Sequence, residues 1–158
     1  MSISLDADIE VFRTIAFVEG FTHEHLRLIA FSAESRSLPE KLLLYDEGQL
    51  LHSAYIVVSG TMTGERRKSA GEANRKREIG AGFILGERAL ILDARATESV
   101  RVVSRARVLQ IRKAMFRRLL QDHPQIAITL RARLMRNVVQ QSAEFDEVAR
   151  RLRALQES

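Results

Sequence analysis

Hydrophobic positions change their spacing twice along the chain, and each change predicts a different kind of element. The first pattern has helical intervals and comprises Ile9, Phe12, Ile15, Ala16 and, after Gly20, Leu26, Ile29 and Ala30. Apolar residues three or four positions apart share one face of a helix, so we expect two helices within residues 6–34. The hydroxyl group of Thr22 can cap the second of these helices.

Short apolar runs separated by glycines replace this pattern from residue 38 onward. The candidate strands are Leu42–Tyr45, Ala54–Ser59, a strand near Thr61–Arg66, Lys76–Ile79, Val100–Ser104 and Val108–Ile111. The sequences Tyr45-Asp46-Glu47-Gly48 and Val58-Ser59-Gly60 are typical of turns between strands. Many short strands with regular turns predict a small antiparallel barrel or jelly roll.

The helical pattern returns near Lys113. Asp122, His123 and Pro124 then form a strong start signal, because a polar cap is followed by proline at the first helical position. No glycine or later proline interrupts the pattern, so we expect one helix from about residue 124 to about residue 155. Its apolar seam alternates spacings of four and three and comprises Leu134, Val138, Phe145, Val148, Leu152 and Leu155, with Gln141 as a polar interruption.

The length of this expected helix bears on assembly. At a rise of ~1.5 Å per residue it would span nearly ~50 Å, too far to be buried along its whole length against one small barrel. A heptad seam of this kind favours a parallel two-stranded homodimer. The alternative is that the helix packs back onto its own barrel.

The composition narrows the classes of function. With 158 residues, 46% hydrophobic and 28% charged, the chain is expected to form one globular domain. It has no cysteine, which excludes disulfides, thiol nucleophiles, iron–sulfur clusters and thiolate zinc sites. No apolar run is long enough to cross a membrane, and the N-terminus lacks the basic start of a secretory signal, so we expect a cytoplasmic protein.

The net charge of +5 is concentrated in residues 101–158, where 13 Lys+Arg face five Asp+Glu. These arginines could contact nucleic acid or an acidic partner, but a solvated helix flank is favoured because no aromatic residues are interleaved for base stacking. No helix-turn-helix follows the expected long helix, so sequence-specific DNA binding is not expected. Two basic triplets, Arg66-Arg67-Lys68 and Arg75-Lys76-Arg77, flank a loop that is either a phosphate-contacting patch or, as we favour, a solvated hairpin.

Neither a metal site nor a catalytic site is expected. The four histidines, His23, His25, His52 and His123, fall on a helix, in a turn and at a helix start, where nothing brings them together as ligands. No Gly-x-Ser-x-Gly motif marks a nucleophile. We therefore expect no catalytic residues and no enzyme.

The segment Ile79–Thr97 carries the most informative chemistry. Its glycines allow close backbone approach and can aim N–H groups into an anion-binding concavity, at which a short helix over Ala89–Leu92 would also point. Glu87 can accept hydrogen bonds from sugar hydroxyls, and Arg95 can form a bidentate pair with a phosphate. These features together suit a sugar phosphate, although neither a dinucleotide fingerprint nor a Walker loop is present.

Five short motifs occur in a characteristic order and spacing. They are Phe21-Thr22-His23-Glu24-His25-Leu26, Leu44-Tyr45-Asp46-Glu47-Gly48, Tyr55-Ile56-Val57-Val58-Ser59-Gly60, the run from Ile79 to Glu87, and Asp122-His123-Pro124. In these motifs residues 8–155 resemble the cyclic nucleotide-binding domain family. The resemblance implies one domain over residues 1–158: N-terminal helices at 6–34, an eight-stranded antiparallel jelly roll at 38–111, and B- and C-helices at 113–156.

The resemblance also implies a ligand, cAMP or cGMP, with no other cofactor. The resemblance implies that the backbone around Gly86 contacts the cyclic phosphate, that Glu87 binds the ribose 2′-hydroxyl, and that Arg95 pairs with the phosphate. Gln141 and Ser142 on the long helix would contact the base across the dimer. The implied binding set is Gly86, Glu87, Arg88, Ala89, Arg95, Ala96, Thr97, Ser99, Gln141 and Ser142.

The segment departs from the family pattern at three points. Arg95 follows Gly86 by nine residues, one fewer than is common, and Ala94 replaces the usual proline. Aligned without a gap, Ala96 rather than Arg95 takes the arginine position, and Ser99 takes the usual Thr/Ser position. Glu98 adds a negative charge close to where an anion would sit.

These observations predict a stand-alone regulatory domain that senses cAMP or a related cyclic nucleotide and signals through its C-terminal helix as a homodimer. The alternative is a ligand-free dimerisation or protein-interaction module with a degenerate phosphate-binding cassette. Such a module would regulate an unidentified protein partner by docking.

Overall fold

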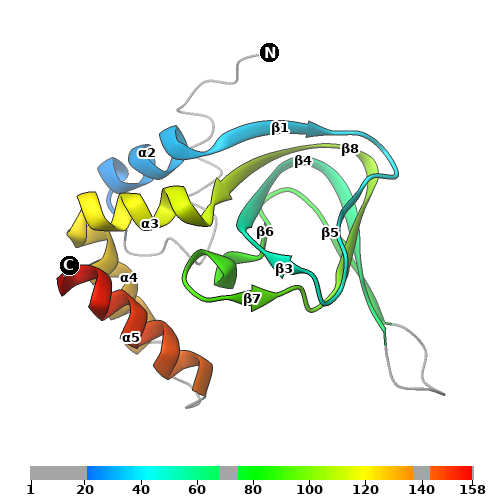
Figure 1. Cartoon of the computed structure of the whole chain (residues 1–158). Coiled ribbons are helices and arrows are strands. Elements are labelled where there is room, and N and C mark those ends of the chain that lie inside the picture. Colours follow the sequence, from blue (N-terminus) through cyan, green and yellow to red (C-terminus); the bar gives the residue numbers. More distant parts are fainter. Residues whose placement is uncertain (1–20, 68–74, 137–142, 158) are drawn as a thin grey trace.

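The computed structural model describes residues 21–67, 75–136 and 143–157, in which a β-barrel lies beside a group of helices (Figure 1). The strands are β1 (Glu34–Leu38), β2 (Leu43–Tyr45), β3 (Leu50–Leu51), β4 (Ser53–Arg66), β5 (Arg75–Ile79), β6 (Ile84–Leu85), β7 (Ala94–Arg95) and β8 (Ser99–Arg112). The helices are α2 (His23–Ser32), the 3-10 helix η2 (Glu87–Leu90), α3 (Lys113–Asp122), α4 (Pro124–Arg136) and α5 (Ala143–Glu157).

The strands pair antiparallel throughout the described chain. One sheet has the order β1-β8-β4-β5, with β2 also on β8 and β6 also on β4, and a second sheet pairs β3 with β7. The long strands β4 and β8 pair with each other from Ser53 and Arg112 to Glu65 and Ser99, and they form the spine of the barrel. The predicted antiparallel β-fold with flanking helices is confirmed.

Two pairs of predicted strands are each one continuous strand. Val100–Ser104 and Val108–Ile111 are parts of β8, and Ala54–Ser59 and Thr61–Arg66 are parts of β4. The expected turn at Val58-Ser59-Gly60 is instead an irregularity inside the continuous strand β4, where the pairing register with β8 shifts. Gly60 has a φ of +89°, and a side-chain carbon added there would lie 2.4 Å from the main-chain oxygen of Arg105. Only glycine fits this position, so its signal marks a bulge rather than a chain reversal.

Strand β1 lies in a region where the apolar pattern predicted no strand. Of its five residues only Leu38 is buried, so the sequence has no alternation of apolar and polar side chains. The strand is held by pairing its whole length to β8, from Glu34 opposite Gln110 to Leu38 opposite Ala106. At its start the side chain of Arg112 donates to the carboxylate of Glu34 across the pair, with an Nε–Oε1 distance of 3.0 Å.

The helix starts follow local sequence signals. Thr22 is the N-cap of α2, and its hydroxyl oxygen accepts a hydrogen bond from the main-chain N–H of His25 at 3.1 Å. Pro124 is the first residue of α4, where its missing N–H costs nothing. Both of these predicted helix starts are confirmed, whereas the first helix expected within residues 6–34 lies largely outside the described residues.

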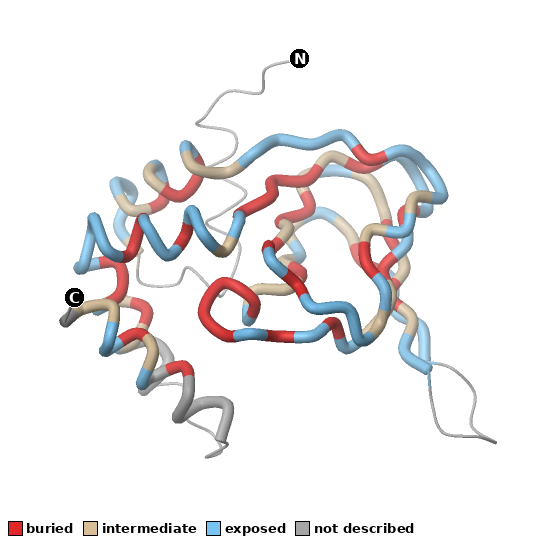
Figure 2. The backbone as a smooth tube through the Cα atoms, viewed as in Figure 1, coloured by how far each residue is buried: buried red, intermediate tan, exposed pale blue. Residues whose placement is uncertain are grey.

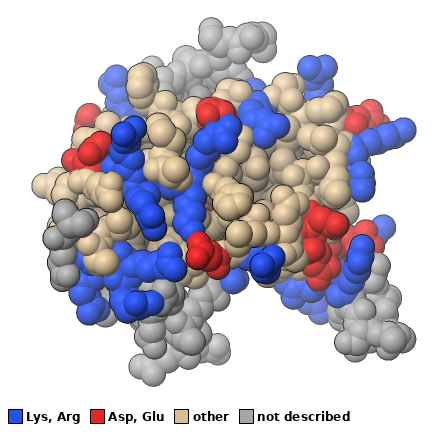
Figure 3. All heavy atoms as spheres, in the orientation of Figure 1, with Lys and Arg blue, Asp and Glu red and all other residues tan. Residues whose placement is uncertain are grey.

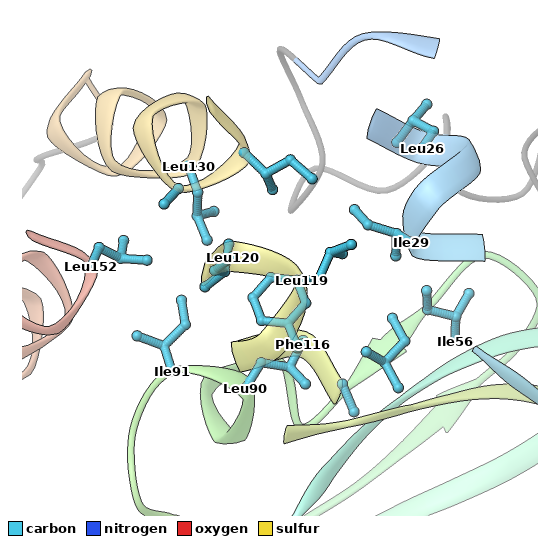
Figure 4. Close-up of a cluster of buried hydrophobic side chains, with 14 of the residues drawn as sticks. Leu26, Ile29, Ile56, Leu90, Ile91, Phe116, Leu119, Leu120, Leu130 and Leu152 are labelled. Carbon is cyan, nitrogen blue, oxygen red and sulfur yellow. The ribbon is translucent and has the colours of Figure 1, made fainter. Parts of the chain in front are cut away.

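The buried side chains form two clusters, and η2 contributes residues to both. In Figure 2 much of the short loop that carries η2, between the barrel strands and the helices, is coloured as buried. The barrel cluster fills the interior of the strands and includes Leu38, Val57, Met62, Ile79, Leu85, Ala89, Val100 and Val108. The helical cluster joins α2, α3, α4 and α5 to the barrel wall and includes Ile29, Leu90, Ile91, Phe116, Leu120, Leu130 and Leu152 (Figure 4). The segment that starts at Gly86 therefore contributes to both cores.

The prediction of one long C-terminal helix is wrong. Helices α4 and α5 pack against each other, and Nη1 of Arg131 donates to Oε1 of Gln156 at 2.8 Å. In a continuous helix these residues, 25 positions apart, would be separated by about 37 Å. The chain therefore reverses between the two helices, which lets it bury apolar side chains that a single straight helix would leave exposed.

Two residues of the predicted dimer seam pack within their own chain, and the dimer itself stays a prediction. Leu152 is fully buried and Val148 nearly so, both in the helical cluster of their own chain. These two residues therefore follow the alternative given in the sequence analysis, in which the helix packs back onto its own chain. Val138 lies outside the described residues, and so do the side chains of Leu134 and Phe145.

Replacing Leu152 with alanine should lower the free energy of unfolding by about 2–5 kcal/mol, because buried methyl groups are lost and a cavity remains. The matched control is Ile128→Ala on α4, where the side chain is 51% exposed. This control should change stability by less than about 0.5 kcal/mol in urea unfolding followed by circular dichroism. Equal stability of the two variants, with dissociation of a dimer by Leu152→Ala alone, would contradict the intramolecular packing.

Candidate functional site

One end of the barrel opens into a cavity of about 220 Å³. Its wall consists mainly of β6, η2, β7 and the residues after β7, with single contributions from β2, β3 and β5. The lining residues are Tyr45, Leu51, Arg77, Ile84, Leu85, Gly86, Glu87, Arg88, Ala89, Ala94, Arg95, Ala96, Thr97 and Glu98. The segment predicted from sequence to carry the binding chemistry therefore forms most of the cavity.

A left-handed turn at Gly86 directs the chain from β6 into η2. Its φ is +73°, and a side-chain carbon added there would lie 3.0 Å from the main-chain oxygen of Ser53. The Gly86 oxygen accepts a hydrogen bond from the N–H of Ala89 at 3.0 Å, which closes the first turn of η2. Glycine is needed here for both conformation and space, and the turn places Glu87 and Arg88 at the cavity.

Arg95 is held at the rim of the cavity. It lies on β7, where Ala94 and Ala96 on either side are buried and Arg95 itself is exposed. Its Nη1 donates to the main-chain oxygen of Gly48 at 3.0 Å. A guanidinium group has five N–H donors, so this anchor leaves donors for an anionic ligand. Both Arg95 and Ala96 line the cavity, so the assignment of the anion-binding position to Arg95 stays a prediction.

Glu98 also lines the cavity, and its charge is paired with Arg77 of β5. Nε of Arg77 donates to both carboxylate oxygens, at 3.0 and 3.1 Å, and Nη2 donates to Oε2. This pairing raises the pKa of Arg77 above its ordinary value. The guanidinium carbon of Arg77 also lies 6.0 Å from the centre of the Phe83 ring.

Tyr45 is a buried residue of the cavity lining. Burial raises the pKa of its phenol well above the ordinary value, and the negative charge of Glu98 raises it further. The phenol therefore stays neutral. The charged residues that line the cavity are three arginines and two glutamates, a set that can hold an anionic group and a hydroxyl-bearing group side by side.

The predicted binding residues separate into three groups. Seven of them line the one cavity: Gly86, Glu87, Arg88, Ala89, Arg95, Ala96 and Thr97. Ser99 does not line it, because its hydroxyl donates to Asp46 and accepts from the N–H of Glu47, fastening the turn between β2 and β3. Gln141 and Ser142 lie outside the described residues.

Outside the stretch Ile79–Glu98 that the sequence analysis discussed, three cavity residues were missed: Tyr45, Leu51 and Arg77. The prediction of a solvated hairpin does not describe Arg77. Its side chain is only half exposed, at 49%, and is bonded to Glu98 at the cavity. The signal that could have found it is strand parity. Arg77 lies two residues before Ile79, a buried position of β5, and thus on the same face of the strand.

A second set of contacts connects the end of this segment to the helices. Nζ of Lys113, the first residue of α3, donates to Oδ1 of Asp93 at 2.6 Å and to the main-chain oxygen of Leu92 at 3.1 Å. On α5, Nη2 of Arg151 lies 3.9 Å from Oδ2 of Asp93. The hydrogen bond from Lys113 lowers the pKa of Asp93, so the carboxylate is ionised at neutral pH.

The described residues contain neither a metal-binding group nor a membrane-spanning helix. Across residues 21–67, 75–136 and 143–157, no three His, Asp or Glu side chains are arranged to hold a metal ion. Among the described helices, none is long and apolar enough to span a membrane.

Comparison with protein families identifies a family whose model matches this chain. The model of the family described as "Cyclic nucleotide-binding domain" matches residues 35–123, more than half of the chain. This range includes all eight described strands except the start of β1, and it includes the whole cavity lining.

Solved structures with the same fold come from bacteria and a eukaryotic parasite. A cyclic nucleotide-binding-like protein from Brucella abortus is 38% identical, with a TM-score of 0.64 over 72% of this chain and 97% of that chain. The regulatory domain of Toxoplasma gondii protein kinase A, solved with cAMP, is 18% identical, with a TM-score of 0.64 over 73% and 45%. The catabolite activator protein of Thermus thermophilus is 23% identical, with a TM-score of 0.64 over 78% and 58%.

Among curated proteins, lysophospholipase nte1 of Neurospora crassa is 24% identical over 102 residues. The match covers 65% of this chain but only 7% of the lysophospholipase.

Gly86→Ala should lower the free energy of unfolding by about 1–2 kcal/mol, the cost of forcing an alanine into the left-handed region. Gly80→Ala is the matched control, since an added carbon there meets no atom within 4 Å. The control should stay within about 0.5 kcal/mol of wild type in the same chemical-unfolding assay. Equal effects of both substitutions would show that the turn at Gly86 is not conformationally constrained.

Proposed function

The chain belongs to the cyclic nucleotide-binding domain family, and on this premise we propose that it is a regulatory domain that binds cAMP or a related cyclic nucleotide in the cavity beside η2. The observation that carries the proposal is the grouping of Gly86, Glu87 and Arg95 around one cavity. The same three residues are those that the family resemblance assigns to phosphate and ribose.

Each group has a chemical role in this proposal. Arg95 supplies charge-assisted hydrogen bonds to the cyclic phosphate from a position fixed by its contact with Gly48. Glu87, half-buried at the start of η2, accepts hydrogen bonds from the ribose hydroxyl. The turn at Gly86 brings main chain rather than a side chain against the ligand, which allows close approach.

Binding would be relayed to the helices through the end of the same segment. Ile91 and Leu92 pack in the helical cluster, and Asp93 is bonded to Lys113 and lies near Arg151. A ligand that repositions η2 therefore changes contacts with α3 and α5 together. The signal passes within one chain, so it does not require the predicted homodimer seam.

A ligand-free protein-interaction module is the second candidate, and exposed side chains on the helices favour it. Basic side chains gather over the helical side of the face shown in Figure 3. Among the residues of the helices, Arg117, Arg118 and Arg153 are exposed. Phe31 on α2 is 82% exposed. A thermal-shift screen discriminates the two candidates, because a ligand that binds the native state must raise its melting temperature.

Arg95→Ala should weaken cAMP binding about 10–100-fold, because a charge-assisted hydrogen-bonding group to the phosphate is lost. Isothermal titration calorimetry with cAMP, and with adenosine as a ligand without phosphate, measures the effect. Adenosine binding should be unchanged by the substitution.

The matched control is Arg101→Ala. Arg101 also donates from Nη1 to a main-chain oxygen, that of Lys41 at 2.8 Å, but it does not line the cavity. Its removal should leave the cAMP affinity within about twofold of wild type, as expected for one exposed charge screened by salt. Full retention of cAMP affinity by Arg95→Ala, or no binding by the wild type at millimolar cAMP, would refute the proposed site.

A further inference from the structure

Arg77 reaches the cavity because of the register of the β4–β5 hairpin. In that register Met62 lies opposite Ile79, and Gly64 lies opposite Arg77. Met62, Gly64 and Ile79 are all buried and thus face the barrel interior. Arg77 shares the face of Ile79, so its side chain enters the open end of the barrel, whereas the neighbours Lys76 and Glu78 face outward.

Glu98 meets Arg77 across β4, which lies between β5 and β8, and Gly64 of β4 makes room for it. A side-chain carbon added to Gly64 would overlap the Glu98 carboxylate, so the acid lies directly over this glycine. The Glu98 side chain is only 14% exposed. Its two oxygens accept hydrogen bonds from Nε and Nη2 of Arg77. A carboxylate of the same chain therefore occupies the edge of the guanidinium group that could bind an anion.

We propose that Arg77 is an additional anion-binding residue of the cavity and that Glu98 is a built-in competitor for it. This inference rests on the proposed function and concerns the same cavity. A ligand phosphate would take the place of the Glu98 carboxylate at Arg77. The affinity of the cavity for an anion is thereby set below what its three arginines would give.

Two physical effects of Glu98 both lower the affinity of the cavity for an anionic ligand. The Glu98 carboxylate repels a second negative charge brought into the cavity, and this repulsion falls away when the charge is removed. The carboxylate also holds Arg77 in a geometry that satisfies its donors, so the ligand must break an existing charge-assisted pair before it can use them. Arg77 is half exposed and packs beside Phe83, which gives its side chain room to change partner.

Glu98→Gln tests the proposal by isothermal titration with cAMP and adenosine. The substitution removes the charge, keeps the shape and keeps one oxygen for Arg77. We expect cAMP to bind about tenfold more tightly, the scale expected for removing one like charge from a partly exposed site, and adenosine affinity to be unchanged. Unchanged or weaker cAMP binding would overturn the inference. Glu98→Ala provides a second measure of the same effect if the glutamine variant does not fold.

The role of Arg77 is tested in the Glu98→Gln background. Adding Arg77→Ala should abolish the gain in cAMP affinity, since the freed guanidinium group is what binds the anion. Adding Lys76→Ala is the matched control, because it removes a positive charge from the outward face of the same strand and should keep the gain. If both double variants lost the increase in cAMP affinity, the effect would come from the net positive charge rather than from Arg77 itself. That result would overturn the assignment of Arg77.

The outcomes separate this inference from the proposed function. Binding of cAMP by wild type without tightening in Glu98→Gln leaves the proposed function intact and overturns the role of Glu98. Binding by Glu98→Gln alone supports the competitor role and shows that the native cavity does not act as a cAMP sensor. Binding by neither protein overturns both.

Discussion

The packing of η2 between two hydrophobic cores is the constraint on which the cavity depends. Ala89 is fully buried in the barrel cluster, and the next residue, Leu90, is buried in the helical cluster. The left-handed turn at Gly86 sets the direction that lets adjacent side chains reach opposite cores. Because protein interiors are close-packed, a displacement of this segment must change the packing of both the barrel cluster and the helical cluster. The segment that forms the wall of the binding cavity therefore also packs against the helices.

Two ion pairs involve the stretch from Gly86 to Glu98, which forms most of the cavity wall. At the barrel end Glu98 is bonded to Arg77, and at the helical end Asp93 is bonded to Lys113. The first pair competes for anions within the cavity in our proposal, while the second connects the segment to α3. An anionic ligand in the cavity would act on both, because it adds charge near one pair and moves the chain that carries the other.

Local signals in the sequence were sufficient for the elements that depend on them. The cap at Thr22, the helix start at Pro124 and the grouping of Gly86 with Glu87 require only neighbouring residues. Longer-range features could not be predicted in this way. Strand parity within β5 places Arg77 on the face of Ile79, but its pairing with Glu98 depends on how separate strands assemble into the barrel, which the sequence of one strand does not contain.

The heptad spacing illustrates the same limit at the C-terminus. A seam of apolar residues must be covered, but its spacing does not identify what covers it. Burial of Leu152 against the helices of its own chain satisfies the seam as well as a second copy would. Strand β1 is the converse case, since its residues have no apolar pattern and its position is fixed by pairing to β8.

The most direct test of the account is hydrogen–deuterium exchange of the wild-type protein with saturating cAMP and, separately, with adenosine. Our account predicts that cAMP slows exchange of the amides in residues 86–97 and changes exchange in α5 in the same titration, whereas adenosine alters neither to a comparable extent. Protection of residues 86–97 without any change in α5 would contradict the proposed link between the cavity and the helices. An unchanged exchange pattern throughout would contradict cyclic nucleotide binding itself.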